Sequence, residues 1–160
     1  MSYLKTLLLF SVSFLEVFKP YLGTWQADFN VADNKPKIQD VSRWERALNG
    51  KAIRTLHSIN EGEYGGESMI FWDSKKQSLV FYYFTTAGFY TQGTLKVLSP
   101  TQFVAYETVT GSKEGITKVK STSDFKDEQF VVSTSYLKKG EWTKPEKRIY
   151  TRSNRQVIFK

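Results

Sequence analysis

The chain has 160 residues, of which 40% are hydrophobic and 16% aromatic, and it carries a formal net charge of +7. This length suits one domain with one core, and the aromatic content is too high for a disordered chain. The absence of cysteine excludes disulfides and thiolate metal sites, and with a single histidine, His57, a histidine-based zinc site would need carboxylate ligands.

The positive charge is concentrated late in the chain. Residues 1–110 hold 11 Lys/Arg and 10 Asp/Glu, a net +1, whereas residues 111–160 hold 12 and 6, a net +6. A basic surface attracts anions in general, but lysines and arginines on strand exteriors usually just face water. The basic residues also gather where the aromatic residues thin out, so no nucleic-acid partner is expected.

Residues 1–19 form a hydrophobic segment with two interpretations. Lys5 is followed by an apolar run to Leu15, the layout of a secretory signal; residues 1–15 would then be removed and the protein secreted or periplasmic. Alternatively the segment is a retained amphipathic helix of a cytoplasmic protein, whose apolar stripe over residues 4–18 would contact a membrane. Pro20 ends any such helix at about Lys19. The domain that follows spans residues 20–160.

The remainder reads as ten short strands, rich in aromatic and β-branched residues and separated by turn residues. The strands are predicted over residues 21–29, 41–48, 51–59, 69–72, 79–85, 89–98, 102–110, 116–125, 129–137 and 142–152. Asn49-Gly50 marks a tight hairpin, residues 61–66 a glycine-rich loop, and residues 153–160 a tail that frays or adds a short edge.

Strands joined by such short loops are antiparallel neighbours, and closing them into a ring removes the exposed edges. The predicted fold class is therefore all-β, a single antiparallel up-and-down β-barrel of about ten strands. A barrel of this strand number can enclose a ligand-sized interior.

At Gly23-Thr24-Trp25 the chain resembles the calycin superfamily, which includes the lipocalins and the fatty-acid-binding proteins. In that superfamily a Gly-x-Trp opens the first strand, and its indole packs at the closed end of the barrel against a late arginine. Arg152 matches that arginine, with Arg148 as the alternative. The segment over residues 70–94 also resembles bacterial lipocalin-like domain families without assigned function. The resemblance covers residues 21–153.

The resemblance implies binding of a small apolar or amphipathic molecule, such as a fatty-acid-like ligand, by a monomer without catalysis or cofactor. Haem-binding barrels of this architecture use a late histidine, whereas His57 is early, so haem is not expected. Arg148-Ile149-Tyr150 resembles the Arg-x-Tyr of fatty-acid-binding proteins, which holds the ligand carboxylate. Residues i and i+2 of a strand share a face, and a guanidinium with a phenol suits a carboxylate. The alternative is that this face meets solvent.

Three other titratable residues lie on predicted strands with apolar neighbours: Arg54, His57 and Glu107. Arg54 and His57 are three residues apart, so on a regular strand they face opposite sides. His57 and Glu107 could act as acid and base in a small barrel enzyme, although a strand histidine is more often simply hydrogen-bonded. The carboxylates of Glu61, Glu63, Glu67 and Asp73 lack the spacing of a calcium loop, so no metal site is predicted.

Aromatic side chains on the predicted strands either fill the core or line an apolar cavity. With the residues above, those counted as ligand-binding candidates are Trp44, Phe71, Phe81, Tyr83, Phe89 and Phe103. A filled interior with a large exposed apolar patch would instead indicate a surface-interaction module.

Overall fold

The computed structural model describes residues 14–30 and 33–160. Its strands are β1 Gly23–Phe29, β2 Ile38–Ala47, β3 Ala52–Ile59, β4 Tyr64–Asp73, β5 Ser78–Thr85, β6 Tyr90–Ser99, β7 Gln102–Thr110, β8 Ile116–Lys126, β9 Gln129–Lys138, β10 Glu141–Trp142 and β11 Glu146–Arg152. Two short 3₁₀ helices, η1 Glu16–Tyr21 and η2 Asn60–Gly62, complete the described elements.

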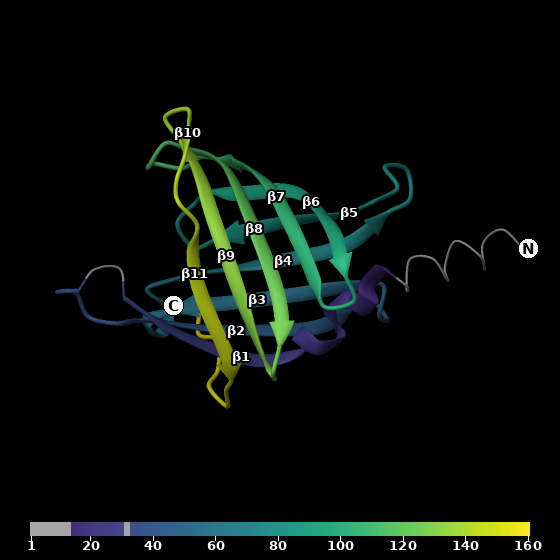
Figure 1. Ribbon diagram of the computed structural model, residues 1–160, viewed down its shortest axis with the longest axis horizontal. Coiled ribbons are helices and arrows are strands. Elements are labelled where there is room, and N and C mark those ends of the chain that lie inside the picture. Colours follow the sequence, from purple (N-terminus) through teal and green to yellow (C-terminus); the bar gives the residue numbers. More distant parts are fainter. Residues whose placement is uncertain (1–13, 31–32) are drawn as a thin grey trace, which may run out of the picture.

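Ten of these strands close into one antiparallel barrel, which confirms the predicted fold class (Figure 1). Strands β1 to β9 follow one another around the ring, and β8 pairs with β9. Strand β11 returns between β9 and β1 and pairs with both, so that no long edge is left open. Strand β10 is the extra one and pairs only with the tip of β9.

Several strand boundaries differ from the sequence-based expectation. Strand β4 begins at Tyr64, so Gly65 and Gly66 lie inside a strand rather than in a loop. The expected last strand over residues 142–152 is divided into β10 and β11. Pro145 lies between them, and a proline cannot donate to the ladder of backbone hydrogen bonds.

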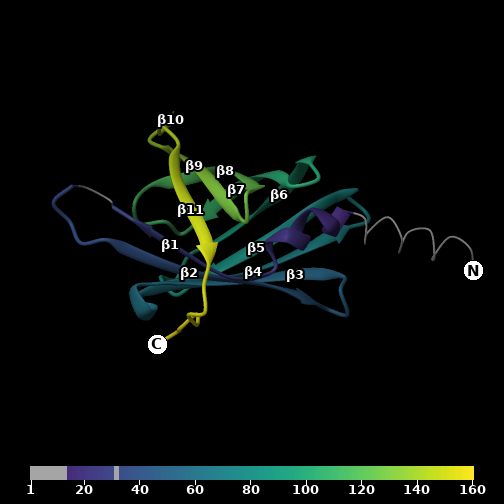
Figure 2. The same ribbon diagram turned by 60° about the horizontal axis from the view of Figure 1, so that its bottom comes forward.

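The C-terminal tail packs on the outer face of the barrel instead of fraying or adding an edge. Arg155 Nη1 donates to Gln39 Oε1 at 2.6 Å, and the Ile158 backbone N–H donates to Ser58 Oγ at 3.0 Å. Figure 2 shows the tail leaving β11 and passing outside the sheet. The tail therefore covers part of the outer wall formed by β2 and β3.

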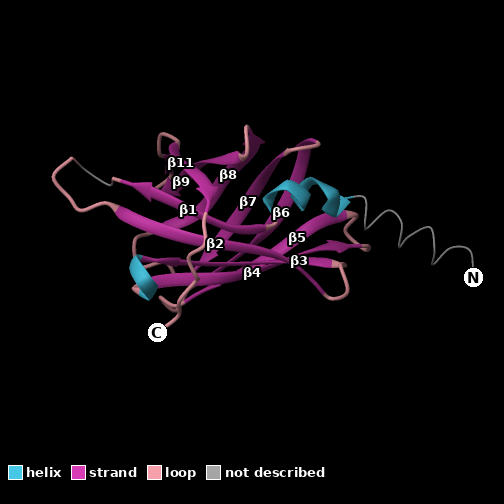
Figure 3. Ribbon diagram, turned by 90° about the horizontal axis from the view of Figure 1, so that it is seen from below, coloured by secondary structure: helices cyan, strands magenta, loops and turns pink. Residues whose placement is uncertain are grey.

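Helix η1 lies at one end of the barrel (Figure 3). An aromatic core fills the interior beneath it, and we call this the closed end. The η1 side chains Val17, Phe18 and Tyr21 are buried there, and η1 continues through Pro20 rather than ending at Lys19. The rings that pack around them, at centroid distances of 4.9 to 6.3 Å, are Trp25, Trp44, Phe103, Phe125 and Phe130. Such aromatic packing supplies much of the apolar burial of a small barrel.

Trp25 and Arg152 meet at this closed end, as cross-strand partners of β1 and β11. The guanidinium carbon lies 3.8 Å from the centre of the indole, and Trp25 Nε1 donates to the Tyr21 carbonyl at 2.6 Å. Arg152 also donates to the backbone carbonyls of Leu22 and Pro20. Arg152 rather than Arg148 therefore stacks on Trp25 and ties η1 to the last strand.

The interpretation of residues 1–15 as a signal peptide stays a prediction, because residues 1–13 lie outside the described residues. Phe14 stacks on Trp72 with ring centroids 4.1 Å apart, and Leu15 is buried. The proposed division between residues 19 and 20 runs through η1. Within residues 14–30 and 33–160, no helix combines the length and apolar character needed to cross a bilayer.

We predict that Gly23→Ala lowers the free energy of unfolding by roughly 2–3 kcal/mol, measured by urea denaturation. Gly23 has φ +114°, and a Cβ there would lie 2.6 Å from Arg152 Nη1. The control is Gly50→Ala, which has φ +80° but open space around the added methyl, so that it should cost only about 1 kcal/mol. Equal losses in the two variants would contradict a role for the Arg152 contact.

Candidate functional site

Beyond the aromatic core, the barrel encloses a cavity of about 400 Å³. Its wall is built from the inward-facing positions of the strands, every second residue, and Trp44 separates it from the closed-end core. The surface of this wall is mainly apolar, as expected, although most of the lining side chains also carry a polar atom. The polar and charged lining residues include Asp40, Ser42, Thr55, His57, Tyr64, Ser68, Tyr83, Thr91, Glu107, Ser121, Thr134, Tyr136, Arg148 and Tyr150.

The structure brings most of the sequence-predicted ligand-binding candidates to this cavity. Those that line it are Trp44, His57, Phe81, Tyr83, Phe89, Glu107, Arg148 and Tyr150. The interior is therefore hollow at one end and filled at the other, and the alternative of a fully filled core is wrong.

Three candidates lie elsewhere. Phe71 alternates with the inward-facing Ile70 and therefore lies on the outer face of β4. Arg54 is also on the outer face, where it pairs with Glu67 and Glu45 at 2.6 and 3.1 Å. Phe103 is buried in the closed-end core. The prediction that these three line the cavity is wrong, whereas the opposite orientation of Arg54 and His57 agrees with strand geometry.

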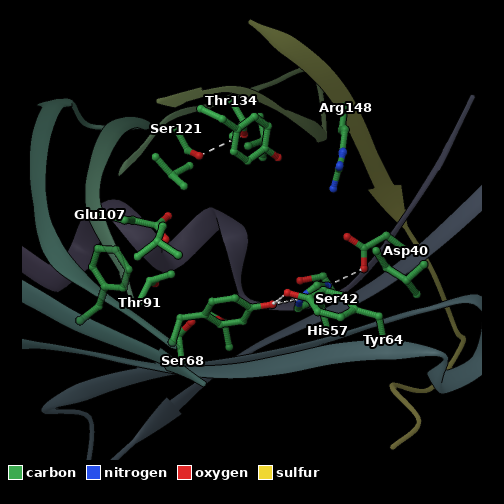
Figure 4. A pocket seen from close by; sticks show the side chains of 18 of the residues that line it. Asp40, Ser42, His57, Tyr64, Ser68, Thr91, Glu107, Ser121, Thr134 and Arg148 are labelled. Atoms are coloured by element: carbon green, nitrogen blue, oxygen red, sulfur yellow. Dashed lines mark hydrogen bonds and ion pairs between the residues drawn. The ribbon is translucent and has the colours of Figure 1, made fainter. Parts of the chain in front are cut away.

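A chain of hydrogen bonds crosses the cavity wall from β4 to β11, and we call it the tyrosine–histidine chain (Figure 4). Tyr64 and Tyr83 hydroxyls lie 2.9 Å apart, and the Tyr83 hydroxyl lies 2.6 Å from His57 Nε2. His57 Nδ1 lies 3.0 Å from Asp40 Oδ1, and the Tyr150 hydroxyl donates to Asp40 Oδ2 at 2.7 Å. The chain thereby connects side chains from five strands, and the buried Asp40 carboxylate links β11 to the other four.

The ionisation of Asp40 determines which group donates in each hydrogen bond of the tyrosine–histidine chain. Burial alone would raise the pKa of Asp40, but its hydrogen bonds with His57 and Tyr150 and the nearby Arg148 charge hold it below the usual value. The ionised carboxylate only accepts, so His57 Nδ1 carries a proton. With a neutral imidazole, Nε2 accepts from Tyr83, and Tyr83 in turn accepts from Tyr64. Every proton in the tyrosine–histidine chain is then used within the protein.

Gly66 makes room for this arrangement. It lies across from His57 on β3, and Ser68, two residues along β4, lies across from Tyr83 on β5. A Cβ at Gly66 would lie 2.2 Å from the Tyr83 ring, so only glycine lets that ring extend over β4 toward His57. The glycine that the sequence indicated as a loop residue is therefore part of the site.

Arg148 is the cavity's cation. Its guanidinium carbon lies 4.1 Å from the centre of the Phe29 ring, and among the described residues it makes no ion pair within 4.0 Å. Figure 4 shows it on the same side of the cavity as Asp40. Tyr150, its expected companion, lines the same cavity but gives its single hydroxyl proton to Asp40. The Arg-x-Tyr pair therefore presents a guanidinium that forms no ion pair within 4.0 Å among the described residues, beside a phenol that already donates to Asp40.

Glu107 lies across the cavity from Arg148 (Figure 4). It has no ion pair and no hydrogen bond to another described side chain, and its cross-strand partners are Gly93 and Val119. Burial raises the pKa of Glu107, with only a small opposing effect of the nearby Thr91 hydroxyl. The Thr91 hydroxyl is buried and forms no hydrogen bond of normal geometry, although it lies close enough to Glu107 to affect its pKa. Trp44 Nε1 is likewise buried without a hydrogen-bond partner among the described residues.

Within the part of the chain that the structure describes, no three His, Cys, Asp or Glu side chains gather in a way that could hold a metal ion.

The outer wall carries an exposed aromatic stack. The Tyr82 and Phe84 rings are 6.3 Å apart and the Phe84 and Tyr90 rings 5.9 Å apart, with Phe84 59% exposed.

Searches against models of known protein families and against curated proteins find no match to this chain.

The sequence-based analysis missed Asp40, Tyr64 and Thr91. Asp40 precedes the expected strand over residues 41–48, but it continues the inward alternation of Ser42 and Trp44. Extending that strand by one residue would have placed the carboxylate in the interior. Tyr64 was assigned to a loop, so its shared face with Ser68 could not be recognised.

We predict that Asp40→Asn lowers the free energy of unfolding by about 1–3 kcal/mol near neutral pH, because it removes a charged acceptor from two buried hydrogen bonds. The Asp40 pKa is lower in the folded state than its ordinary value of 3.8, so its contribution is present above that pH and is lost below it. Urea titrations should show the deficit shrinking as the pH falls below 3.8. Asp28→Asn, on the exposed outer face, is the control.

Glu107→Gln should act in the opposite direction. The Glu107 pKa is higher in the folded state than its ordinary value of 4.5, so the wild-type protein loses stability as the pH rises above 4.5 and the carboxyl ionises. We expect the variant to be about 1 kcal/mol more stable near neutral pH and equal to wild type in acid. The exposed Glu114→Gln variant should change neither value, and a Glu107→Gln protein that is less stable would show that the carboxylate supports the fold.

Proposed function

We propose that this protein binds a small amphipathic molecule inside its barrel, with an anionic group of the ligand on Arg148. The observation that carries the proposal is a cavity-lining guanidinium without an ion-pair partner among the described residues. A charge held in a partly desolvated cavity gains most from a partner that arrives with the ligand. The cavity volume of about 400 Å³ is within the usual range for small-molecule sites.

The lining suits an amphipathic ligand, because its surface is mainly apolar and a few charged and polar groups lie within it. Phe81, Phe89, Val109, Val119 and Val132 offer apolar contacts, while Arg148 and Glu107 offer charged ones. A fatty-acid-like ligand fits the proposal with its carboxylate on Arg148 and a short hydrocarbon body.

Binding is favoured over acid–base catalysis by the way His57 is held. Both ring nitrogens are hydrogen-bonded to protein groups, to Asp40 and to Tyr83. Burial raises the pKa of the Tyr83 phenol, so it stays protonated and serves as a donor. A general base needs a free lone pair within reach of the substrate, and the tyrosine–histidine chain leaves none on the imidazole.

Kinship with the calycin barrels belongs to the same proposal. It is supported by the Trp25 and Arg152 stack at the closed end and by the glycine that opens β1. Those barrels bind small ligands, which is the function we infer from the cavity itself.

The proposal is tested with 1-anilinonaphthalene-8-sulfonate, which combines an apolar ring system with an anionic sulfonate. We expect saturable binding of one molecule per chain, with energy transfer from Trp44 in the cavity wall. Arg148→Gln should weaken the affinity by about tenfold or more, because it removes a charge-assisted contact of roughly 1.5–3 kcal/mol.

The matched control is Arg43→Gln, which removes a positive charge from the outer face, where Arg43 is 59% exposed. Its affinity for the dye should equal that of the wild type. Unchanged binding by a folded Arg148→Gln protein, or equal weakening in both variants, would reject the proposed anion site.

A further inference from the structure

We infer that the ligand of this cavity is bipolar: its anionic group pairs with Arg148 and a cationic group, of the ammonium type, pairs with Glu107. The inference rests on the proposed function, because it takes the same cavity and the same Arg148 anchor. What it adds is the second charge of the ligand and the residue that selects it.

The first observation is that two opposite charges line one cavity without meeting. Arg148 comes from β11 and Glu107 from β7, and β8 and β9 lie between them in the ring. No ion pair within 4.0 Å joins them. Opposite charges that serve only the fold normally pair directly, since each pays the cost of leaving water. Here both are left facing the same space (Figure 4).

The second observation concerns the surroundings of Glu107. The residues directly across from it on β6 and β8 are Gly93 and Val119, which offer no side-chain donor. The Thr91 side chain beside it is 3% exposed, and its buried hydroxyl also lacks a hydrogen bond of normal geometry among the described residues. The Glu107 carboxylate can therefore accept from an ammonium group, which has three N–H donors to give.

The third observation is that no donor of the tyrosine–histidine chain is directed at Glu107. The tyrosine–histidine chain uses its protons among Tyr64, Tyr83, His57 and Asp40. No hydrogen bond to Glu107 is made by another described side chain, so a donor that enters the cavity finds this carboxylate available. A ligand carrying only an anion would place its charge opposite an unpaired carboxyl group and gain nothing from it.

The test uses straight-chain amino acids from γ-aminobutyrate to ω-aminocaprylate, each compared by calorimetry with the unsubstituted alkanoate of the same length. Charging the far end of an alkanoate normally weakens its binding to a cavity, because the ammonium must leave water. We expect the reverse here: at the chain length that spans the two residues, the amino acid binds about tenfold more tightly than its alkanoate.

Glu107→Gln should remove this advantage while leaving alkanoate binding unchanged or tighter, and Arg148→Gln should weaken both series. Glu114→Gln, a substitution of an exposed glutamate, should leave the ratio as in wild type. Alkanoates that bind through Arg148 with no gain from an amino group would reject the inference and keep the proposed function. An advantage that survives in Glu107→Gln would also reject it, and so would the failure of both series to bind at millimolar concentration.

Discussion

The return of β11 between β9 and β1 is the constraint on which the rest of the structure depends. Without it, β9 and β1 would each present a row of unpaired backbone groups, and the interior would open to water. The same strand carries Arg148, Tyr150 and Arg152 at alternate positions on its inner face. One seven-residue strand thus provides the cavity's cation, an anchor for Asp40 and the guanidinium that stacks on Trp25.

The barrel divides its two tasks between its two ends. At the closed end, aromatic rings and η1 exclude water and stabilise the fold through apolar burial. The cavity is lined by the carboxylates of Asp40 and Glu107 and by the Arg148 guanidinium, and two buried polar atoms of its wall, Thr91 Oγ1 and Trp44 Nε1, have no hydrogen-bond partner among the described residues.

Much of the fold could be predicted from the sequence, because short aromatic strands with tight turns admit few arrangements. Asn49-Gly50 fixed one hairpin, and Gly23, Trp25 and Arg152 were assigned to the end where they meet. The site was harder to predict. When a strand boundary is misplaced by a few residues, the residues beyond it are not recognised as part of the strand, so the face to which they point cannot be inferred. That error hid Asp40 and Tyr64.

The polar groups in the cavity wall were missed for a different reason. Serines and threonines on inward positions look the same in the sequence as those that face solvent, and only closure of the ring decides which face is inside. Phe71 is the opposite case: it is aromatic, but its position in the alternation of β4 places it on the outer wall. Pairing across strands, rather than composition, determined which candidates reached the interior.

The register of β1 with β11 has a consequence for how a molecule could reach the interior. Only Trp25 with Arg152 and Gln26 with Thr151 are paired there, so the two strands diverge toward the cavity. The stacked Phe29 and Arg148 side chains bridge the widening gap. A guest that drew the guanidinium away from Phe29 would remove this contact between β1 and β11.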